Sequence, residues 1–391
     1  MRVVVFGGGY AGIVAVTRLE RRLPESAEIV LVDQRPTHLI KHELHRVIRR
    51  PEFAAELQIP FADILKRAQF DQRTIASIDF DAGAVTFEDG EQLSYDAGIV
   101  ALGSRPNYYG LDGVEEHSVP IATPADATAI ADSMADLLED RSGTVVVAGA
   151  GLAGVQVAGE LAAVRNDTDV TDVSIILIER ASEIVPGSSA RFQEAIRQAL
   201  TERNVEIRTD TTVSGADDSV VGLADTLDIP ADLFVWAGGI QGQALFDGDR
   251  PRVRADLRLG DRTFGAGDAV QAIDEDGSLV EPTAQAAVGM ATVAADNAIL
   301  RAQADDQTGF RPAYHRYRET GESRIVTVGD TAVAQLGPTV VTGPAARALK
   351  SVVGVRYLSA AGAIENALTV FRSEFDLAHP RAGRELDRDR L

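Results

Sequence analysis

The chain has 391 residues, which at roughly 150 residues per domain predicts two or three domains. Its 59 acidic residues outnumber 38 basic ones, and the net charge of −21 excludes general nucleic-acid binding because phosphate backbones are repelled. The chain has no cysteine, which excludes disulfides, thiolate nucleophiles and cysteine-ligated metal centres, so redox chemistry requires a bound cofactor. The opening MRVVVFGGG lacks the parts of a signal peptide, and no apolar run reaches about 18 residues, so we expect no transmembrane helix.

A glycine-rich turn near the start of the chain has the spacing of a dinucleotide-binding fingerprint. Gly7, Gly9 and Gly12 form G-x-G-x-x-G between a predicted strand and a predicted helix, and Asp33 ends the next predicted strand. The first glycine permits a tight turn, the second lets the backbone approach a pyrophosphate, and the third lets the helix pack on the strand. The helix N-terminus then faces the phosphates, and Asp33 accepts a hydrogen bond from a ribose hydroxyl.

The same pattern recurs in the middle of the chain. Gly149, Gly151 and Gly154 repeat the spacing, and Glu179 ends the strand that follows. Two complete fingerprints predict two dinucleotides, and the natural pair for a redox protein without cysteine is FAD and NAD(P)H. Glu179 repels a 2′-phosphate and so favours NADH, although Arg180 beside it is the residue type that a 2′-phosphate site uses.

The remaining patterns predict an α/β fold with two Rossmann-like domains and a C-terminal region. Thr74–Phe87 alternates and predicts a hairpin that ends in the turn Glu88–Gly90. We expect the first dinucleotide-binding domain at 1–107 and 253–310, the second inserted at 108–252, and the C-terminal region at 311–391. The predicted strands are Arg2–Phe6, Glu28–Asp33, Asp96–Ala101, Thr144–Ala148, Val173–Glu179, Asp232–Ala237 and those within Ser323–Leu336, and the predicted helices are Ile13–Leu23, Val155–Val164, Ala284–Arg301 and Pro344–Phe371.

Motifs that follow these strands carry a family resemblance. IVALGS at 99–104, DLFVWAGG at 232–239 and TFGAGD at 263–268 are similar to motifs of the two-dinucleotide-binding-domain flavoproteins. Within that superfamily the chain most resembles the type II NADH dehydrogenases, which are single-chain NADH:quinone oxidoreductases. The segments of that closer resemblance are LVDQRPTHLI, ALGSRPNYYGLDGVEEHSVPI, VWAGGIQG and PTAQAA. The resemblance covers nearly the whole chain and thins after Phe310.

The resemblance implies FAD on the first fingerprint, NADH on the second, and a quinone held near Pro282–Gln285 and the C-terminal region. It implies that Ala101, Gly103, Asp268, Ala284 and Gln285 contact FAD in addition to the fingerprint residues. It also implies that Gly238 contacts NADH and that Gln285 takes part in catalysis.

Two positions depart from the family pattern. Relatives often have a second glutamine four residues after the PTAQ glutamine, lining the quinone site, where this chain has Gly289. Many relatives have a glutamate where this chain has Gln156, and an amide cannot shuttle a proton as a carboxylate does. Glu160, one helical turn further on, is a candidate substitute, although we expect a carboxylate on a solvated helix face there. Gln156 and Glu160 complete the predicted catalytic set.

The absence of cysteine separates the chain from two related enzyme classes. Sulfide:quinone oxidoreductases and disulfide reductases both use cysteine pairs, so neither chemistry is available to this chain.

A histidine-rich segment follows the first two strands. His38, His42 and His45 would share one face if the segment were a single helix, which is an arrangement that binds metal. We favour a polar segment beside the flavin and predict no metal site. Trp236, at a strand end, is expected to pack in the core or against a cofactor.

The stretch Pro344–Arg372 is basic and apolar on an otherwise acidic chain. It carries Arg347, Lys350, Arg356 and Arg372 against Glu365, which gives four positive charges less one negative, or +3. Such a helix suits an anionic membrane surface. An ordinary helix that packs its apolar face on the FAD domain is the alternative.

Together these features predict a cytoplasmic enzyme on the inner face of the cell membrane, with NADH and a quinone as substrates. They leave a homodimer open. One alternative is a soluble NAD(P)H-dependent flavin reductase that serves a protein acceptor such as ferredoxin. Another is a non-catalytic flavin protein that senses NADH.

Overall fold

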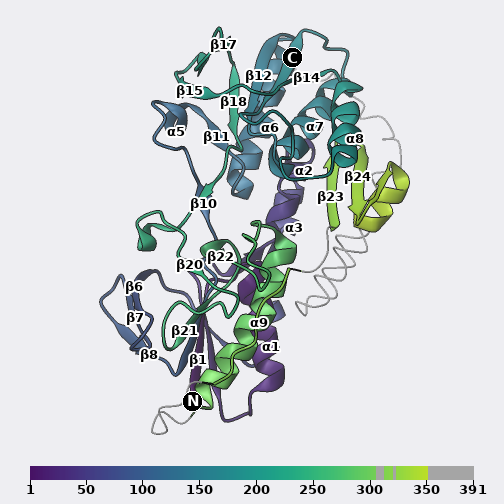
Figure 1. Ribbon diagram of the computed structural model, residues 1–391. Helices are drawn as coiled ribbons and strands as arrows, with labels where there is room; N and C mark the ends of the chain where they lie inside the picture. Colours follow the sequence, from purple (N-terminus) through teal and green to yellow (C-terminus); the bar gives the residue numbers. More distant parts are fainter. Residues whose placement is uncertain (305–311, 320–322, 351–391) are drawn as a thin grey trace.

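The computed structural model describes residues 1–304, 312–319 and 323–350. Figure 1 shows two α/β bodies, one above the other, between which the chain passes in both directions. The two passages pair with each other, since β10 (Arg105–Pro106) and β19 (Ile240–Gln241) form a short antiparallel ladder. The predicted fold class, an α/β chain with two Rossmann-like cores, is confirmed.

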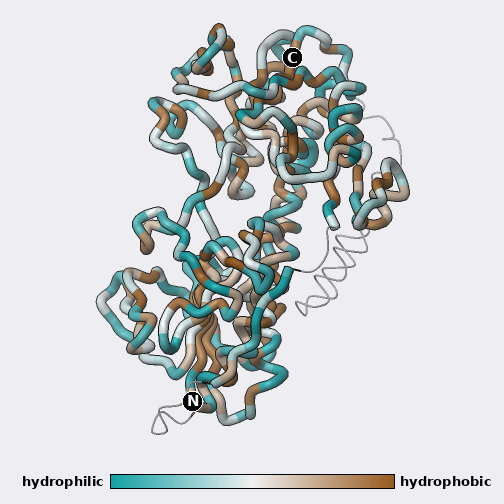
Figure 2. Tube along the Cα trace, viewed as in Figure 1, coloured by the Kyte–Doolittle hydropathy of each residue, from teal (hydrophilic) through white to brown (hydrophobic). Residues whose placement is uncertain are grey.

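The lower body is built on a five-stranded parallel sheet with the strand order β21-β9-β1-β2-β5. Helices α1 and α9 pack against each other and against this sheet. Apart from the edge strand β5, the strands are buried on both faces, and Figure 2 shows hydrophobic residues gathered along them. These elements are β1 (Arg2–Phe6), α1 (Tyr10–Arg22), β2 (Glu28–Val32), β5 (Gln69–Asp71), β9 (Ala97–Val100), β21 (Thr263–Gly265) and α9 (Ala284–Ala302).

The upper body repeats this architecture with a second five-stranded parallel sheet, in the order β11-β18-β12-β13-β14. Three longer helices accompany it, and α6 begins with a capping box in which Thr123 and Asp126 bond each other's backbone. These elements are β11 (Val119–Pro120), α6 (Pro124–Glu139), β12 (Gly143–Ala148), α7 (Leu152–Asn166), β13 (Val173–Ile178), α8 (Ala190–Thr201), β14 (Val205–Arg208) and β18 (Leu233–Trp236).

A third, antiparallel sheet lies beside the upper body. Its strands β23 (Ser323–Val328), β24 (Thr331–Leu336) and β25 (Thr339–Thr342) form a meander that packs on α7 and α8. Residues 344–350 continue as helix, and the rest of the predicted helix Pro344–Phe371 lies outside the described residues. None of the helices in the described part of the chain has the length and hydropathy that crossing a bilayer requires.

Shorter elements connect these sheets and extend their edges. They are β3 (Thr37–Leu39), η1 (Lys41–Glu43), α2 (His45–Arg49), α3 (Phe53–Glu56), β4 (Gln58–Pro60), α4 (Phe61–Ile64), β6 (Ile75–Asp79), β7 (Ala84–Phe87), β8 (Gln92–Ser94), α5 (Val114–His117), β15 (Val213–Ala216), β16 (Val220–Leu223), β17 (Ile229–Pro230), η2 (Ala244–Phe246), β20 (Arg252–Val253), η3 (Gly267–Ala269) and β22 (Gln271–Ala272).

The predicted long strands are confirmed, and so are the predicted helices other than Pro344–Phe371, of which only residues 344–350 are described; two details differ. The antiparallel hairpin expected over Thr74–Phe87 is present as β6-β7, with Gly83 at a positive φ in its turn, and the predicted turn at Glu88–Gly90 leads into an additional third strand, β8. Both fingerprint helices begin earlier than predicted, since Gly9 and Gly151 themselves occupy the N-cap positions.

We predict that Asn297→Ala lowers the free energy of unfolding by about 2–4 kcal/mol, because it removes three part-buried hydrogen bonds to backbone groups. The Asn297 side chain is fully buried on α9, where it donates to the carbonyls of Asp256 and His315 and accepts from the His315 amide. Denaturant unfolding measures the change. Thr292→Ala on the same helix is the control and should cost less than about 1 kcal/mol; equal losses would contradict this role of Asn297.

Candidate functional site

The first glycine turn has the geometry that a fingerprint requires. Gly7 has a φ of +100°, and a Cβ there would lie 2.5 Å from the carbonyl oxygen of Ala101. A Cβ on Gly12 would overlap the carbonyl oxygen of Gly7. The Gly8 amide donates to Asp33 Oδ2 at 2.7 Å, which joins the turn to the end of β2.

The second glycine turn reproduces this arrangement contact by contact. Gly149 has a φ of +97°, and a Cβ there would lie 2.5 Å from the carbonyl oxygen of Ala237. A Cβ on Gly154 would overlap the carbonyl oxygen of Gly149. The Ala150 amide donates to Glu179 Oε2 at 2.7 Å, and Glu179 Oε1 accepts from the Ala181 amide at 2.9 Å.

The middle glycine of each turn tests whether the residues fit a dinucleotide. A Cβ on Gly151 would meet nothing within 4 Å, and the atom nearest to a Cβ on Gly9 would be the Ala101 carbonyl oxygen at 4.0 Å. Protein packing therefore does not require glycine at these two positions. The bare backbone at the start of α1 and of α7 leaves room for a pyrophosphate against the free helix amides. Both turns fit a dinucleotide such as FAD or NADH.

The other predicted FAD contacts lie around the carboxyl end of the lower sheet. Ala101 and Gly103 follow β9, and the carboxylate of Asp268 in η3 accepts from Ser104 Oγ at 3.2 Å. The first turn of α9 lies beside η3, since a Cβ on Gly267 would be 3.4 Å from Ala287 Cβ. Ala284 and Gln285 stand in that turn, with the Gln285 side chain exposed. The structure therefore places these predicted contacts along one edge of the lower sheet.

Two cations near Asp268 were not predicted from the sequence. Arg250 donates to the backbone carbonyls of Asp268 and Val270 at 2.8 Å, which holds η3 in place. Burial lowers the pKa of Lys41, while the Asp268 carboxylate opposes that shift. The sequence offers only a weak signal for either residue, because a single Lys or Arg that belongs to no spaced motif cannot be told apart from other basic residues.

The three clustered histidines do not share a helix face, which corrects one of the arrangements considered from the sequence. His38 lies in β3, His42 in η1 and His45 in α2, and each meets different partners. His38 is fully buried, and its Nδ1 lies 2.9 Å from the Gly8 carbonyl oxygen, so it braces the first glycine turn. His42 pairs with Tyr10 of the same turn. Across the described residues, no group of His, Cys, Asp and Glu side chains is arranged to hold a metal ion.

Gln156 lies inside the protein. It is 9% exposed on α7, and its amide nitrogen lies 2.9 Å from His45 Nδ1 and 3.3 Å from Thr327 Oγ1. Burial and the nearby Lys350 cation hold the pKa of His45 well below its ordinary value, so the ring is neutral. Gln156 therefore joins α7 to α2 and β23 and does not face the second glycine turn.

Glu160 is also buried, which corrects our expectation of a solvated helix face. Its side chain is 2% exposed because α2 and the β23–β24 meander cover this face of α7. Oε2 lies 2.9 Å from Arg49 Nε, an ion-pair contact without hydrogen-bond geometry. Burial raises the pKa of Glu160 to about 7 in spite of that arginine.

A second buried charge pair lies in the same layer. Lys350 Nζ lies 3.0 Å from both carboxylate oxygens of Glu43, and both side chains are nearly inaccessible. Burial alone would raise the pKa of Glu43, but Lys350 and His42 outweigh it and hold the pKa well below the ordinary value. Glu43 and Lys350 were not predicted, because they are far apart in the sequence and belong to no motif.

The structure gives a physical reason for glycine at position 289. A Cβ on Gly289 would lie 2.9 Å from Cε2 of Tyr317, whose side chain is 95% buried against α9. Tyr317 is held there by its own amide, which donates to the Ala255 carbonyl at 2.7 Å. A glutamine at 289 has no room unless Tyr317 moves.

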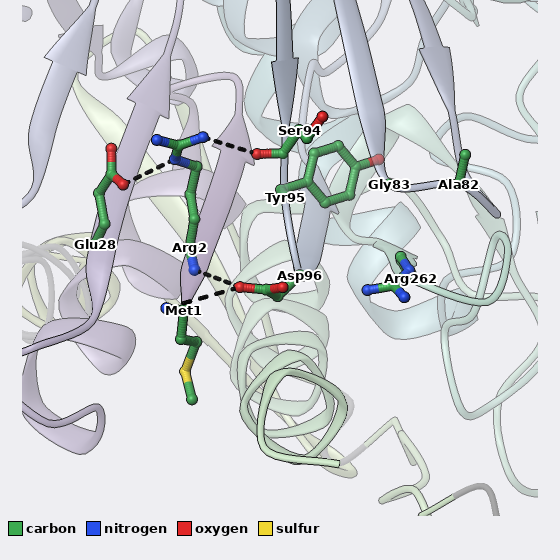
Figure 3. Close-up of a pocket in the computed structure, with 9 residues that line it drawn as sticks. All are labelled: Met1, Arg2, Glu28, Ala82, Gly83, Ser94, Tyr95, Asp96 and Arg262. Carbon is green, nitrogen blue, oxygen red and sulfur yellow. Dashed lines mark hydrogen bonds and ion pairs between the residues drawn. The ribbon is translucent and has the colours of Figure 1, made fainter. Parts of the chain in front are cut away.

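A polar pocket lies at the opposite, amino-terminal edge of the lower sheet (Figure 3). Its volume is about 460 Å³, and it is lined by the start of β1, the end of β8 and the turn at Gly83. Arg2 bonds Glu28 at 2.9 Å, the Ser94 carbonyl at 3.1 Å and, through its amide, Asp96 at 2.7 Å. These groups satisfy one another, and the pocket is remote from both glycine turns.

A family comparison agrees with this geometry. Residues 1–260 match the model of the family described as pyridine nucleotide-disulphide oxidoreductase. The chain belongs to that family. Because it contains no cysteine, its own side chains cannot supply the dithiol chemistry that the family name mentions.

Individual relatives confirm the resemblance to type II NADH dehydrogenases. The chain is 30% identical over 241 residues to the Bacillus subtilis NADH dehydrogenase-like protein YutJ, covering 61% of this chain and 65% of that relative. It is 28% identical over 369 residues to the Synechocystis demethylphylloquinone reductase NdbB, covering 88% and 89%. Further relatives carry the name type II NADH:quinone oxidoreductase.

The fold is also shared with a solved structure. Plasmodium falciparum NDH2 in complex with NADH superposes with a TM-score of 0.82 at 14% identity, covering 97% of this chain and 99% of that one. At this identity the comparison supports the fold.

We predict that His38→Ala weakens flavin binding about fivefold, because a hydrogen bond to the Gly8 carbonyl contributes about 1 kcal/mol. Flavin fluorescence measures the dissociation constant. His117→Ala, at α5 and remote from the turn, is the control. An unchanged constant in His38→Ala would contradict the bracing role.

His38 also predicts a pH dependence of stability. Burial lowers its pKa to about 4 from 6.5, so between these values the unfolded chain binds more protons than the folded one. The stability that neutral His38 contributes is therefore present above about pH 6.5 and lost as the pH falls towards 4. Thermal unfolding of wild type and His38→Gln over this range should show a shallower slope for the variant, and parallel slopes would refute it.

Proposed function

We propose that this protein is an FAD-dependent NADH dehydrogenase that passes electrons from NADH to a membrane quinone without pumping protons. The observation that carries the proposal is the recurrence of one turn geometry. The Gly8 amide meets Asp33 and the Ala150 amide meets Glu179, each at 2.7 Å. A cysteine-free chain with two such sites is suited to redox chemistry through two dinucleotides.

The first site is proposed for FAD and the second for NADH. Gly7, Gly9 and Gly12 accommodate the pyrophosphate of FAD, Asp33 binds its ribose, and Ala101, Gly103 and Asp268 line the rest of the site with the first turn of α9. Gly149, Gly151 and Gly154 would do the same for NADH, Glu179 would bind its adenosine ribose, and Gly238 would be a further contact. When bound there, FAD would supply the two-electron redox chemistry that links a reduced nicotinamide to a second acceptor.

The adenosine ribose contact favours NADH over NADPH. Glu179 is held by two backbone amides, so its carboxylate keeps a fixed position at the end of β13. A 2′-phosphate there would meet a like charge that cannot rotate away. Arg180 is exposed, and among the described residues it makes no ion pair with Glu179 that would offset this repulsion.

The acceptor side is proposed from the sequence resemblance and from the names of the relatives. Gln285 stands exposed at the first turn of α9 and is the proposed quinone contact. Gln156 donates hydrogen bonds but cannot exchange a proton. Glu160 is the proposed proton source, since burial raises its pKa to about 7 and keeps it partly protonated near neutral pH.

Attachment to the inner face of the cell membrane is proposed through the basic, apolar stretch Pro344–Arg372. Residues 344–350 belong to the described helix, and Lys350 is buried against Glu43, so this lysine does not serve the membrane. Arg347, whose Nη1 donates to the Asp330 carbonyl at 3.2 Å, lies nearer the surface. The remaining cations of the stretch lie outside the described residues.

An anaerobic two-step titration tests the proposal. NADH should bleach the flavin absorption of the FAD-loaded protein, and a soluble quinone analogue should restore it. Failure of NADH to bleach the flavin would refute the donor. Bleaching that only a protein acceptor reverses would favour a soluble reductase, and bleaching with no turnover would favour an NADH sensor.

The same titration at several pH values tests Glu160. Reoxidation by quinone should slow as the pH rises through about 7, because Glu160 then loses its proton. In Glu160→Gln this pH dependence should disappear, while bleaching by NADH stays within about twofold. Glu194→Gln, an exposed carboxylate on α8, is the control and should keep the wild-type profile.

A further inference from the structure

Tyr109 lies where the chain passes from the lower body to the upper one, just after β10. Its φ is 55°, in the left-handed region that a residue with a Cβ rarely adopts. Its side chain is 54% exposed, although it is aromatic. Such strain persists where surrounding contacts impose it, and it gathers at ligand sites.

Three contacts impose this conformation. The Tyr109 amide donates to Asn107 Oδ1 at 2.8 Å, and the hydroxyl donates to the Gly238 carbonyl at 3.1 Å. The ring meets the Trp236 indole edge to face, with centroids 6.5 Å apart at 68°. Trp236 is fixed in turn, since its Nε1 donates to the Asn107 carbonyl at 2.9 Å.

The sheet topology shows which end of a dinucleotide reaches this ring. From β12 the chain runs to β13 and β14 on one side, whereas β18 lies on the other side, so the strand order reverses between β12 and β18. Dinucleotides bind across the carboxyl edge at such a reversal. With the adenosine ribose on Glu179 after β13 and the pyrophosphate on Gly149–Gly154, the other half extends over the end of β18.

Two glycines, Gly238 and Gly239, follow the end of β18. A Cβ on Gly239 would collide with the Tyr109 hydroxyl, and a Cβ on Gly238 would lie 2.5 Å from the Trp236 ring. The surface over Gly238 and Gly239 is therefore formed by Tyr109, which is solvent-exposed, with Trp236 buried beneath. An exposed aromatic ring over bare backbone is suited to contact a flat heterocycle.

We propose that the Tyr109 ring forms the wall of the site for the nicotinamide half of the donor. This inference rests on the proposed function, because it takes the second fingerprint to bind NADH. It adds a binding residue that belongs to neither fingerprint and that acts from the passage between the two bodies.

NAD⁺ is the probe for a binding test on the FAD-loaded protein, because it binds without reducing the flavin. Trp236 is the only tryptophan, so the change in tryptophan fluorescence when NAD⁺ is added to the FAD-loaded protein reports on this site. Tyr109→Gly, which removes the ring and suits the backbone conformation, should raise the Kd for NAD⁺ and the KM for NADH about tenfold. The kcat should stay within about twofold, and Tyr109→Phe should recover most of the affinity.

Controls separate binding from a structural effect. Asp247→Gly removes another non-glycine residue with positive φ, at 52°, and should leave the Kd unchanged. FAD content and thermal stability of the Tyr109 variants should match wild type, and Tyr109→Asn serves if the glycine variant folds poorly. A Kd within about twofold of wild type in both Tyr109→Gly and Tyr109→Asn would overturn the proposal. Failure of wild type itself to bind NAD⁺ would instead refute the proposed function.

Discussion

The structure depends on one hydrogen bond that occurs twice, between a backbone amide in a glycine turn and the carboxylate at the end of the neighbouring parallel strand. It joins Gly8 to Asp33 and Ala150 to Glu179. Each bond orients a turn whose first glycine adopts a φ near 100° and presses against the end of a third strand. The bond ties the turn to the ends of the neighbouring parallel strands, and the first amides of the helix that follows have no partner within that helix and can bind an anionic group.

The two bodies meet through a layer of buried polar groups between α2, α7 and the β23–β24 meander. Glu43 with Lys350 and Arg49 with Glu160 are charge pairs in this layer, and His45 with Gln156 and Thr327 is a neutral cluster. Isolated buried charges are costly, so each needs its partner in place. The layer therefore fixes the positions of three distant parts of the chain relative to one another. It also keeps Glu160 in buried surroundings that favour its protonated form.

The sequence was informative where local spacing determines structure. Both glycine turns, their acids and the long strands follow from patterns within about 30 residues, which is the size of one βαβ unit. It was misleading where tertiary contacts decide. The sequence predicts Glu160 to be a surface residue on α7, but α2 and the meander cover it. The spacing of the three histidines is compatible with one helix, but the segment divides into a strand and two short helices. Pairs such as Glu43 and Lys350 leave no local signal in the sequence. The need for glycine at position 289 is explained only by its contact with Tyr317, which is distant in the sequence.

The central claim is that the two turns bind two different dinucleotides independently. Equilibrium dialysis of wild type, Asp33→Ala and Glu179→Ala against FAD and NAD⁺ tests it most directly. Wild type should bind one FAD and one NAD⁺ per chain, Asp33→Ala should lose FAD affinity about tenfold or more while keeping NAD⁺, and Glu179→Ala should show the reverse. Loss of the same ligand in both variants, or of both ligands in either one, would contradict the account.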